Sequence, residues 1–332
     1  MKRRDALRGA LAAGTAGPGL AAALSATRHD VDAALAAHRS STDLGFWDST
    51  AERYGHGYHG QSPAEVLAGL LDDFAELGVR LSEPQTVKAR TALCHVTGRM
   101  AGMVAIVLHD LGHHREAHRW FGTASRAAEQ SGDALLHAWV LAREAMVPLN
   151  YGAPQAAAEL AGRARHLAGR RPSAAAALAA AVSSRALAAA GHREEARQAV
   201  ADVEHMAERL APEQRADTWF GYPAQKHHVH LSQALTLLGE TDRAYETQRR
   251  ALELSRTPSL MTRALIALDT ATCKAQDGDR EAAAHLATRT YTDLPTVYRT
   301  GLTRTRALAL HRKLPTDTPG RTTLGETLET VA

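Results

Sequence analysis

The stretch Leu111-Gly-His-His-Arg-Glu-Ala117, in one-letter code LGHHREA, has four similar stretches further along the chain. They are YGAPQAA at 151, AGHREEA at 190, LGETDRA at 238 and DGDREAA at 277. The glycines of the five stretches lie 40, 39, 48 and 39 residues apart, so each interval holds two helices and two turns. This repeat predicts a row of helical hairpins in which a glycine ends the first helix of each pair.

Two further columns of the repeat hold small residues. The fifth residue after each glycine is alanine in all five copies: Ala117, Ala157, Ala196, Ala244 and Ala283. The seventh residue before each glycine is small: Ala105, Ala145, Ser184, Ser232 and Ala271. Because small side chains allow close approach, we expect both columns to lie where the paired helices touch.

The composition also favours helices. The 332 residues are 45% hydrophobic but only 5% aromatic, and alanine supplies much of the apolar surface. The formal charge of +3 is too small to indicate a strong field for nucleic acid. Cys94 and Cys273 each lie in an apolar helical pattern far apart in sequence, which favours buried free thiols over the alternative of a disulfide.

The repeat resembles the tetratricopeptide repeat. The shared features are a small residue in helix A, glycine at the turn, alanine five residues later in helix B and, in the first copy, Phe121 followed by Ala124. The resemblance covers roughly residues 85–290 and implies an all-α right-handed superhelix of antiparallel helical hairpins, a tetratricopeptide-like α-solenoid. The intervals exceed the usual length of about 34 residues, and no copy has the large aromatic near the start of helix A, which implies longer and less regular helices.

The chain is expected to divide into four parts and about thirteen helices. These parts are a flexible basic segment (1–28), N-terminal helices (29–84), the repeats (85–312) and a loose tail (313–332). We expect helices at 29–40, at 62–78 and, as one closing helix, at 294–313. The glycine-rich stretch 44–60 is expected to be an irregular connection, with a helix frayed at Gly55 and Gly57 as the alternative.

The amino end has the order of a twin-arginine export signal. Arg3 and Arg4 precede a mild apolar run and small residues, with cleavage expected near 23–25. Glycine and proline interrupt that run, which is too short and weakly apolar to span a bilayer. We therefore expect a cytoplasmic protein without a membrane span, with export through this twin-arginine-like signal as the alternative.

Two groups of histidines raise the question of a metal site. Gly112 separates His109 from the following helix, so only His114 and His118 form a helical pair in the first group. In the second group, His227 and His230 share a helix face after an aromatic anchor that opens a long helix. Neither group offers a recognisable set of four ligands, so we expect no metal and partly exposed histidines.

Catalytic motifs are missing from the sequence. It has no glycine-rich phosphate loop, no Gly-x-Ser-x-Gly elbow and no Cys-x-x-Cys pair. We therefore expect no catalytic residue and no cofactor. A metal-dependent enzyme is the least favoured alternative.

The chain is also similar to the sensing or binding half of actinobacterial regulators that join a helix-turn-helix domain to tetratricopeptide-like helices. The pieces that carry this resemblance are the Arg-Arg-x-x-Leu stub, VDAALAAHR, SPAEVLAGLLDDFAEL, LCHVTGRMAGMVAIVLHDLG and the Asp-x-Trp-Phe before the fourth turn. Only about 28 residues precede the first expected helix, too few for a helix-turn-helix domain, so direct specific DNA binding is not expected.

The two resemblances together imply a non-catalytic regulatory binding module. Its partner would be a peptide, a small ligand or a protein held in the concave groove, and a homodimer is compatible with the sequence. The alternative is an exported helical-repeat adaptor.

Family positions thirteen, ten, six, three and two residues before each turn glycine line the groove in tetratricopeptide proteins. Transferred to this chain, these offsets select Arg99, Ile106, His109, Asp110, Trp139, Met146, Leu149, Asn150, Arg185, Lys226, Gln233, Thr236, Thr272 and Gln276. Three of these are cationic, which predicts a basic groove, with Trp139 as an apolar anchor, suited to an acidic peptide or a ligand carboxylate. The alternative is that some of these residues form ion pairs between adjacent repeats.

Overall fold

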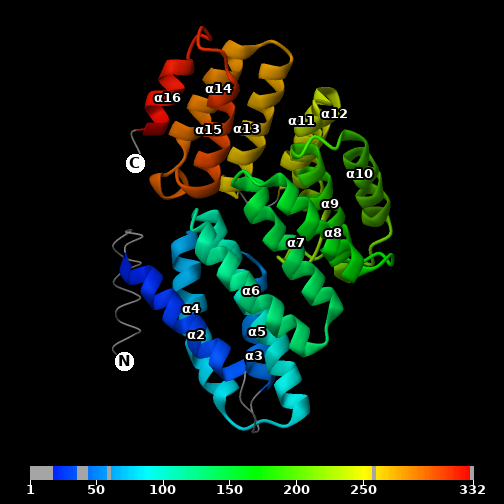
Figure 1. Ribbon diagram of the computed structural model, residues 1–332. Helices are drawn as coiled ribbons and strands as arrows, with labels where there is room; N and C mark the ends of the chain where they lie inside the picture. The colour runs from blue at the N-terminus through cyan, green and yellow to red at the C-terminus, as the bar shows by residue number, and fades with distance from the viewer. Residues whose placement is uncertain (1–17, 36–43, 58–60, 256–258, 330–332) are drawn as a thin grey trace.

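A computed structural model describes residues 18–35, 44–57, 61–255 and 259–329, and every regular element in these ranges is a helix (Figure 1). The all-α prediction is therefore confirmed. The α-helices are α2 (Pro18–Leu35), α3 (Leu44–Gly55), α4 (Pro63–Ser82), α5 (Val87–Asp110), α6 (His114–Ser131), α7 (Ala134–Asn150), α8 (Pro154–Ala168), α9 (Ala174–Ala189), α10 (Arg193–Glu208), α11 (Ala224–Leu238), α12 (Thr241–Glu253), α13 (Leu260–Gln276), α14 (Arg280–Asp293), α15 (Gly301–Lys313) and α16 (Arg321–Glu329). Short 3-10 helices occupy Pro212–Arg215 (η1) and Thr296–Tyr298 (η2).

Five hairpins form the middle of the molecule, as the repeat predicts. They are α5–α6, α7–α8, α9–α10, α11–α12 and α13–α14. The glycine between the two helices of each hairpin has a positive φ of 86°, 96°, 86°, 73° and 96° in chain order. The first helices α5, α7, α9, α11 and α13 contact one another in that order, so they form one continuous layer.

Both columns of small residues are buried in the helix contacts. All ten side chains have an exposed fraction of 0%. A larger side chain at any of them would have to push two helices apart, because protein interiors have few voids.

Replacing Ala196 with leucine should therefore lower the free energy of unfolding by about 1–3 kcal/mol. Ala201 lies on the same helix, α10, but is exposed, so Ala201→Leu is the matched control and should change stability by less than about 0.5 kcal/mol. Denaturant titration followed by circular dichroism measures both. Equal stability of the two variants would contradict the assignment of this column to the helix contact.

The N-terminal boundaries differ from the prediction. Helix α2 begins at Pro18 with Leu24 and Val31 buried, so the flexible segment does not extend to residue 28. The paired arginines of the export-like signal lie outside the described residues. Residues 44–55 form helix α3, so the prediction of an irregular connection is wrong and the alternative of a helix ending near Gly55 is confirmed. Trp47 and Ala51 lie one helical turn apart and are buried beside α5.

The helix expected at 62–78 is confirmed as α4 and is extended to Ser82. Its start is stabilised by a capping box. The Ser62 hydroxyl accepts a hydrogen bond from the Glu65 backbone N–H at 3.3 Å, and the Glu65 carboxylate accepts one from the Ser62 backbone N–H at 2.8 Å.

The C-terminal predictions need two corrections. The single helix expected at 294–313 is divided into η2 and α15, since Gly301 has a φ of 53°. The tail is not loose, because helix α16 contacts α14 and α15 and buries Leu324 and Leu328. Helices α3 and α16 raise the number of described α-helices to fifteen from about thirteen expected.

Replacing Leu324 with alanine should lower the free energy of unfolding by about 2–5 kcal/mol, since the side chain is completely buried. Thr323→Ala changes the neighbouring exposed residue of α16 and should have little effect. Thermal unfolding compares the variants. A Leu324→Ala protein as stable as the Thr323→Ala protein would mean that α16 does not contribute to the folded core.

Helix α15 joins the last hairpin to the first. It contacts both α5 and α7, and its first residue, Gly301, packs against the turn that follows α5. A side chain at Gly301 would collide with the carbonyl oxygen of Asp110 and the backbone nitrogen of Gly112. The last hairpin is thereby connected to the first through α15.

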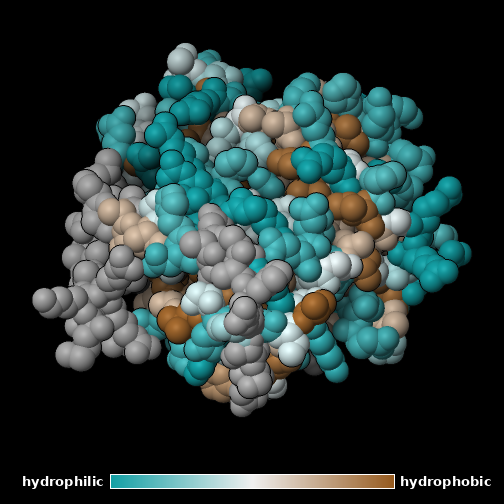
Figure 2. Space-filling view, turned by 60° about the horizontal axis from the view of Figure 1, so that its bottom comes forward, coloured by the Kyte–Doolittle hydropathy of each residue, from teal (hydrophilic) through white to brown (hydrophobic). Residues whose placement is uncertain are grey.

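The cysteine prediction is confirmed, since Cys94 and Cys273 are buried free thiols. By length and composition α5 could cross a membrane, but 83% of its apolar window is buried inside the protein, as in the core helix of a folded domain. The face shown in Figure 2 is largely hydrophilic, with hydrophobic atoms in scattered patches.

Candidate functional site

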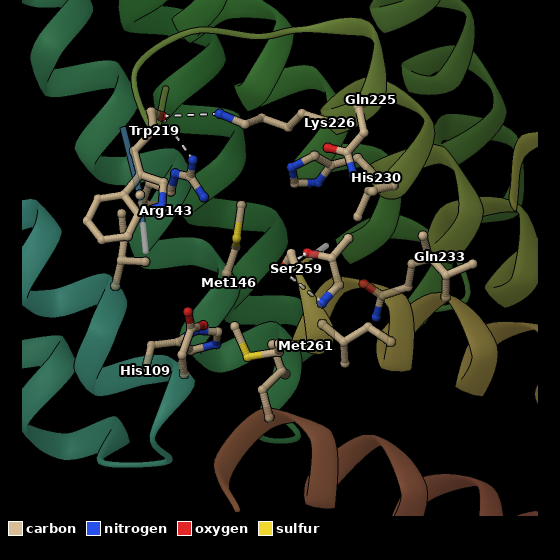
Figure 3. A pocket seen from close by; sticks show the side chains of 18 of the residues that line it. His109, Arg143, Met146, Trp219, Gln225, Lys226, His230, Gln233, Ser259 and Met261 are labelled. Carbon is tan, nitrogen blue, oxygen red and sulfur yellow. Dashed lines mark hydrogen bonds and ion pairs between the residues drawn. The ribbon is translucent and has the colours of Figure 1, made fainter. Parts of the chain in front are cut away.

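A cavity of about 350 Å³ lies between the first and last hairpins. All five first helices of the hairpins contribute to its wall, together with residues 217–219 and helix α15. In Figure 3, Arg143, Lys226 and His230 lie toward the Trp219 end, Met261 lies toward His109, and Met146 lies between the two ends. We call this space the central cavity.

The long interval of the repeat builds one end of the central cavity. Its additional residues form the connection 209–223 between α10 and α11, which brings Trp219 to the cavity. The Trp219 carbonyl oxygen accepts hydrogen bonds from Trp139 Nε1 and Arg143 Nη2, both at 2.9 Å. The Trp219 backbone N–H donates to the carbonyl oxygen of Gly55 at 2.6 Å, so the connection is attached to α3 as well as to α7.

Lys226 mainly stabilises the 209–223 connection. Its ammonium group donates to the carbonyl oxygens of Gly221 at 2.6 Å and Thr218 at 2.7 Å, with a longer contact to Trp219 at 3.4 Å. Burial and the neighbouring Arg143 hold the pKa of Lys226 well below its usual value. Lys226 therefore lines the cavity while its donors are already engaged.

Arg185 and His230 form a buried pair in the wall. Arg185 Nη1 donates to His230 Nδ1 at 3.0 Å, and the two residues are 6% exposed each. Burial and the nearby Arg306 lower the pKa of Arg185 to about 9, and burial beside Arg185 holds the pKa of His230 well below its usual value. His230 is therefore neutral, with its proton on Nε2, and cannot compensate the charge of Arg185.

Three carboxylates also line the central cavity. Two of them contact residues other than Arg185, and the third lies at the exposed rim. Asp269 accepts hydrogen bonds from Arg306 at 2.5 Å and from the Ser232 hydroxyl at 2.8 Å. Asp110 lies 3.1 Å from His109 Nδ1. Asp217 is exposed at the rim.

The residues at the opposite end join α5 to α7. His109 Nε2 lies 3.0 Å from Asn150 Nδ2, and the Tyr151 hydroxyl donates to the His109 carbonyl oxygen at 2.9 Å. Because His109 is buried and contacts Asp110 through its other ring nitrogen, this cluster positions the cavity wall.

The structure brings together eight of the fourteen residues selected from the sequence. The residues that line the central cavity are Ile106, His109, Asp110, Met146, Asn150, Arg185, Lys226 and Gln233. Those that do not line it are Arg99, Trp139, Leu149, Thr236, Thr272 and Gln276.

The excluded residues have structural partners. Arg99 donates to Asp48 at 3.0 Å and to Glu52 at 2.9 Å, both on α3, and its guanidinium lies 4.7 Å from the centre of the Phe220 ring. Arg99, thirteen residues before Gly112, therefore lies under α3 and the 209–223 connection. Gln276 Nε2 donates to the Thr236 carbonyl oxygen at 2.9 Å, so this residue links α13 to α11.

Sequence reasoning missed Arg143, His230 and Asp269 as cavity residues. All three lie nine residues before a turn glycine, a column that the chosen offsets omit. That column lies one helical turn from the column six residues before the glycine, which includes Met146, Arg185 and Gln233, so helical periodicity could have found it. Arg306 lies on α15, outside the repeats, and no repeat offset could have selected it.

The two histidine groups do not converge into a metal site. Among the described residues, no group of three or more His, Cys, Asp or Glu side chains is placed to bind a metal ion. His114 and His118 are exposed, and His118 Nδ1 lies 2.9 Å from Glu144. The prediction that the histidines are partly exposed was wrong for His230, because Tyr222 and Arg185 cover its ring. Helix α11 begins at Ala224, so the expected aromatic anchor lies in the connection before it.

The arrangement is chemically suited to binding. It offers a recessed surface of apolar and charged residues, with a buried guanidinium that contacts no carboxylate of the described wall. No family model, curated protein or solved structure matches this chain.

Proposed function

We propose that the chain is a non-catalytic binding module with a regulatory role, which holds a small ligand in the central cavity. The five hairpins would form a right-handed tetratricopeptide-like superhelix, and the cavity would be its concave face, narrowed by α15 and the 209–223 connection. A cytoplasmic location is part of this proposal, with export as the alternative.

The observation that carries the proposal is the convergence of all five first helices on one cavity. Its volume of about 350 Å³ is near the lower end of the range of about 300–1,000 Å³ for small-molecule sites. This size favours a small ligand over a folded protein partner or a long peptide.

The wall chemistry supports binding over catalysis. His230 accepts from Arg185 at Nδ1, and within the described residues it is hydrogen-bonded to this guanidinium and to no nucleophile. Ser259, a hydroxyl on the cavity wall, caps α13 by accepting from the Thr262 backbone N–H at 3.3 Å. These contacts organise the wall and do not form a nucleophile–base pair.

Titration with N-phenyl-1-naphthylamine, a neutral probe that fluoresces in apolar surroundings, tests the cavity. We expect saturable binding with one site per chain. Gln233→Trp would fill the cavity and should abolish it, whereas Gln155→Trp, on the exposed face of α8, should leave it unchanged. If neither this probe nor its anionic analogue, 8-anilinonaphthalene-1-sulfonate, binds in a way that Gln233→Trp blocks, the proposed function is wrong.

A further inference from the structure

Arg185 is a buried cation with an incomplete set of contacts. It is 6% exposed, and its Nε has no hydrogen-bond partner among the described residues. Its hydrogen-bond acceptor among the described residues is the neutral ring of His230, at 3.0 Å. A guanidinium has five N–H donors, so most of its hydrogen-bonding capacity is unused.

The charges around Arg185 have both signs, since burial and Arg306 lower its pKa whereas Asp269 raises it. Arg143, Lys226 and Arg306 also line the central cavity, and the wall carboxylate Asp269 is in direct contact with Arg306 at 2.5 Å. Asp110 contacts His109, and Asp217 lies at the exposed rim. The protein therefore places no carboxylate of the described wall in hydrogen-bonding contact with Arg185.

We infer that the ligand of the central cavity is a monocarboxylate with an apolar body, and that its carboxylate binds Arg185; this inference rests on the proposed function. A carboxylate matches the planar fork of a guanidinium and accepts two parallel N–H bonds. It would also neutralise a charge that is costly to bury without a partner. One carboxylate is specified because one cavity guanidinium, that of Arg185, has a neutral ring as its acceptor within the described wall. Arg143 and Lys226 donate to backbone carbonyls, and Arg306 donates to Asp269.

The rest of the wall suits the apolar body. Ile106, Met146, Met261 and Leu302 line the cavity with hydrocarbon and thioether surface. Methionine side chains adapt to irregular apolar shapes, so the wall can accept a flexible chain. The small volume limits the body to a short acyl chain or to one or two apolar residues of a peptide ending in a free carboxylate.

The experiment uses octanoate, 1-octanol and the two fluorescent probes with the full chain. Octanoate should displace 8-anilinonaphthalene-1-sulfonate competitively, and 1-octanol should be at least tenfold weaker. N-acetyl-leucyl-leucine and its C-terminal amide form a second pair that tests a peptide carboxylate. Whichever acid binds more tightly identifies the source of the carboxylate, whereas equal binding of acid and neutral partner in both pairs would overturn the inference.

Two variants connect the preference to Arg185. Arg185→Gln should weaken octanoate at least tenfold while changing N-phenyl-1-naphthylamine binding less than threefold. Gln233→Glu places a carboxylate in the same column of the next first helix and should repel octanoate to a similar degree, with residue 185 itself still arginine. Gln155→Glu, on exposed α8, is the matched control and should bind like the original chain.

The outcomes separate the two proposals. Tight binding of both neutral and anionic probes, unaffected by Arg185→Gln and Gln233→Glu, would preserve the cavity as a binding site but reject the carboxylate. Loss of all binding in the original chain would reject the proposed function itself. A preference for octanoate that disappears in both variants would support both.

Discussion

Replacing Gly301 with alanine should lower the free energy of unfolding by about 2–5 kcal/mol, because left-handed strain of about 1–2 kcal/mol adds to overpacking of about 1–3 kcal/mol. Gly301 has a φ of 53°, and an added Cβ would collide with backbone atoms of Asp110 and Gly112. The collision can be relieved only by moving the start of α15 away from the turn after α5. Since Leu302 and Arg306 line the central cavity, probe binding should weaken together with stability.

Gly191→Ala is the matched control for this effect. Gly191 also has a positive φ, 86°, but an added Cβ would meet no atom within 4 Å. This variant should therefore show the left-handed strain alone, about 1–2 kcal/mol, and should bind N-phenyl-1-naphthylamine normally. Denaturant titration measures the free energy of unfolding of both variants. An equal decrease in the two variants would show that the contact between α15 and the turn after α5 does not stabilise the fold.

Replacing Arg185 with methionine should raise the stability of the ligand-free protein, by about 1–4 kcal/mol. Methionine has a similar length, and it removes a buried charge that no carboxylate of the described residues contacts. The His230 Nδ1 atom loses its donor, which costs about 1 kcal/mol, less than the desolvation of a guanidinium. Stability and function would thus oppose each other at one residue.

Arg99→Met is the informative comparison, because the expected sign is opposite. Arg99 contacts two carboxylates and the face of Phe220, so its removal should lower stability by about 1 kcal/mol. Thermal unfolding of the two variants without ligand measures the difference. A loss of more than about 1 kcal/mol for Arg185→Met would show that Arg185 is stabilised by the folded protein alone.

The repeat alone was sufficient to predict the hairpins. Glycines with positive φ and small side chains at close helix contacts are local requirements that only a few residue types meet, so they remain visible as columns in the sequence. The ten helices of the repeats, the helix at 63–82 and the buried cysteines follow from such local patterns.

The ends of the chain were harder to predict. Trp47 of α3 and Leu324 of α16 are in segments with few periodic apolar residues, and each segment becomes helical where a neighbouring helix covers its short apolar face. Local propensity is weak in such segments, so tertiary packing decides their structure.

The candidate site also has features that a local pattern predicts and features that depend on tertiary contacts. The column six residues before each glycine placed Met146, Arg185 and Gln233 in the cavity wall, because a helical period is a property of the sequence. Whether a cation in that wall has a partner depends on elements distant in sequence. Asp48 of α3 contacts Arg99, and Asp269 of α13 contacts Arg306, whereas within the described part of the chain Arg185 contacts the neutral ring of His230. The sequence thus determined which residues share a helix face. The tertiary structure decided which charges are balanced, because an ion pair requires two side chains within a few ångströms and the sequence contains no record of that distance.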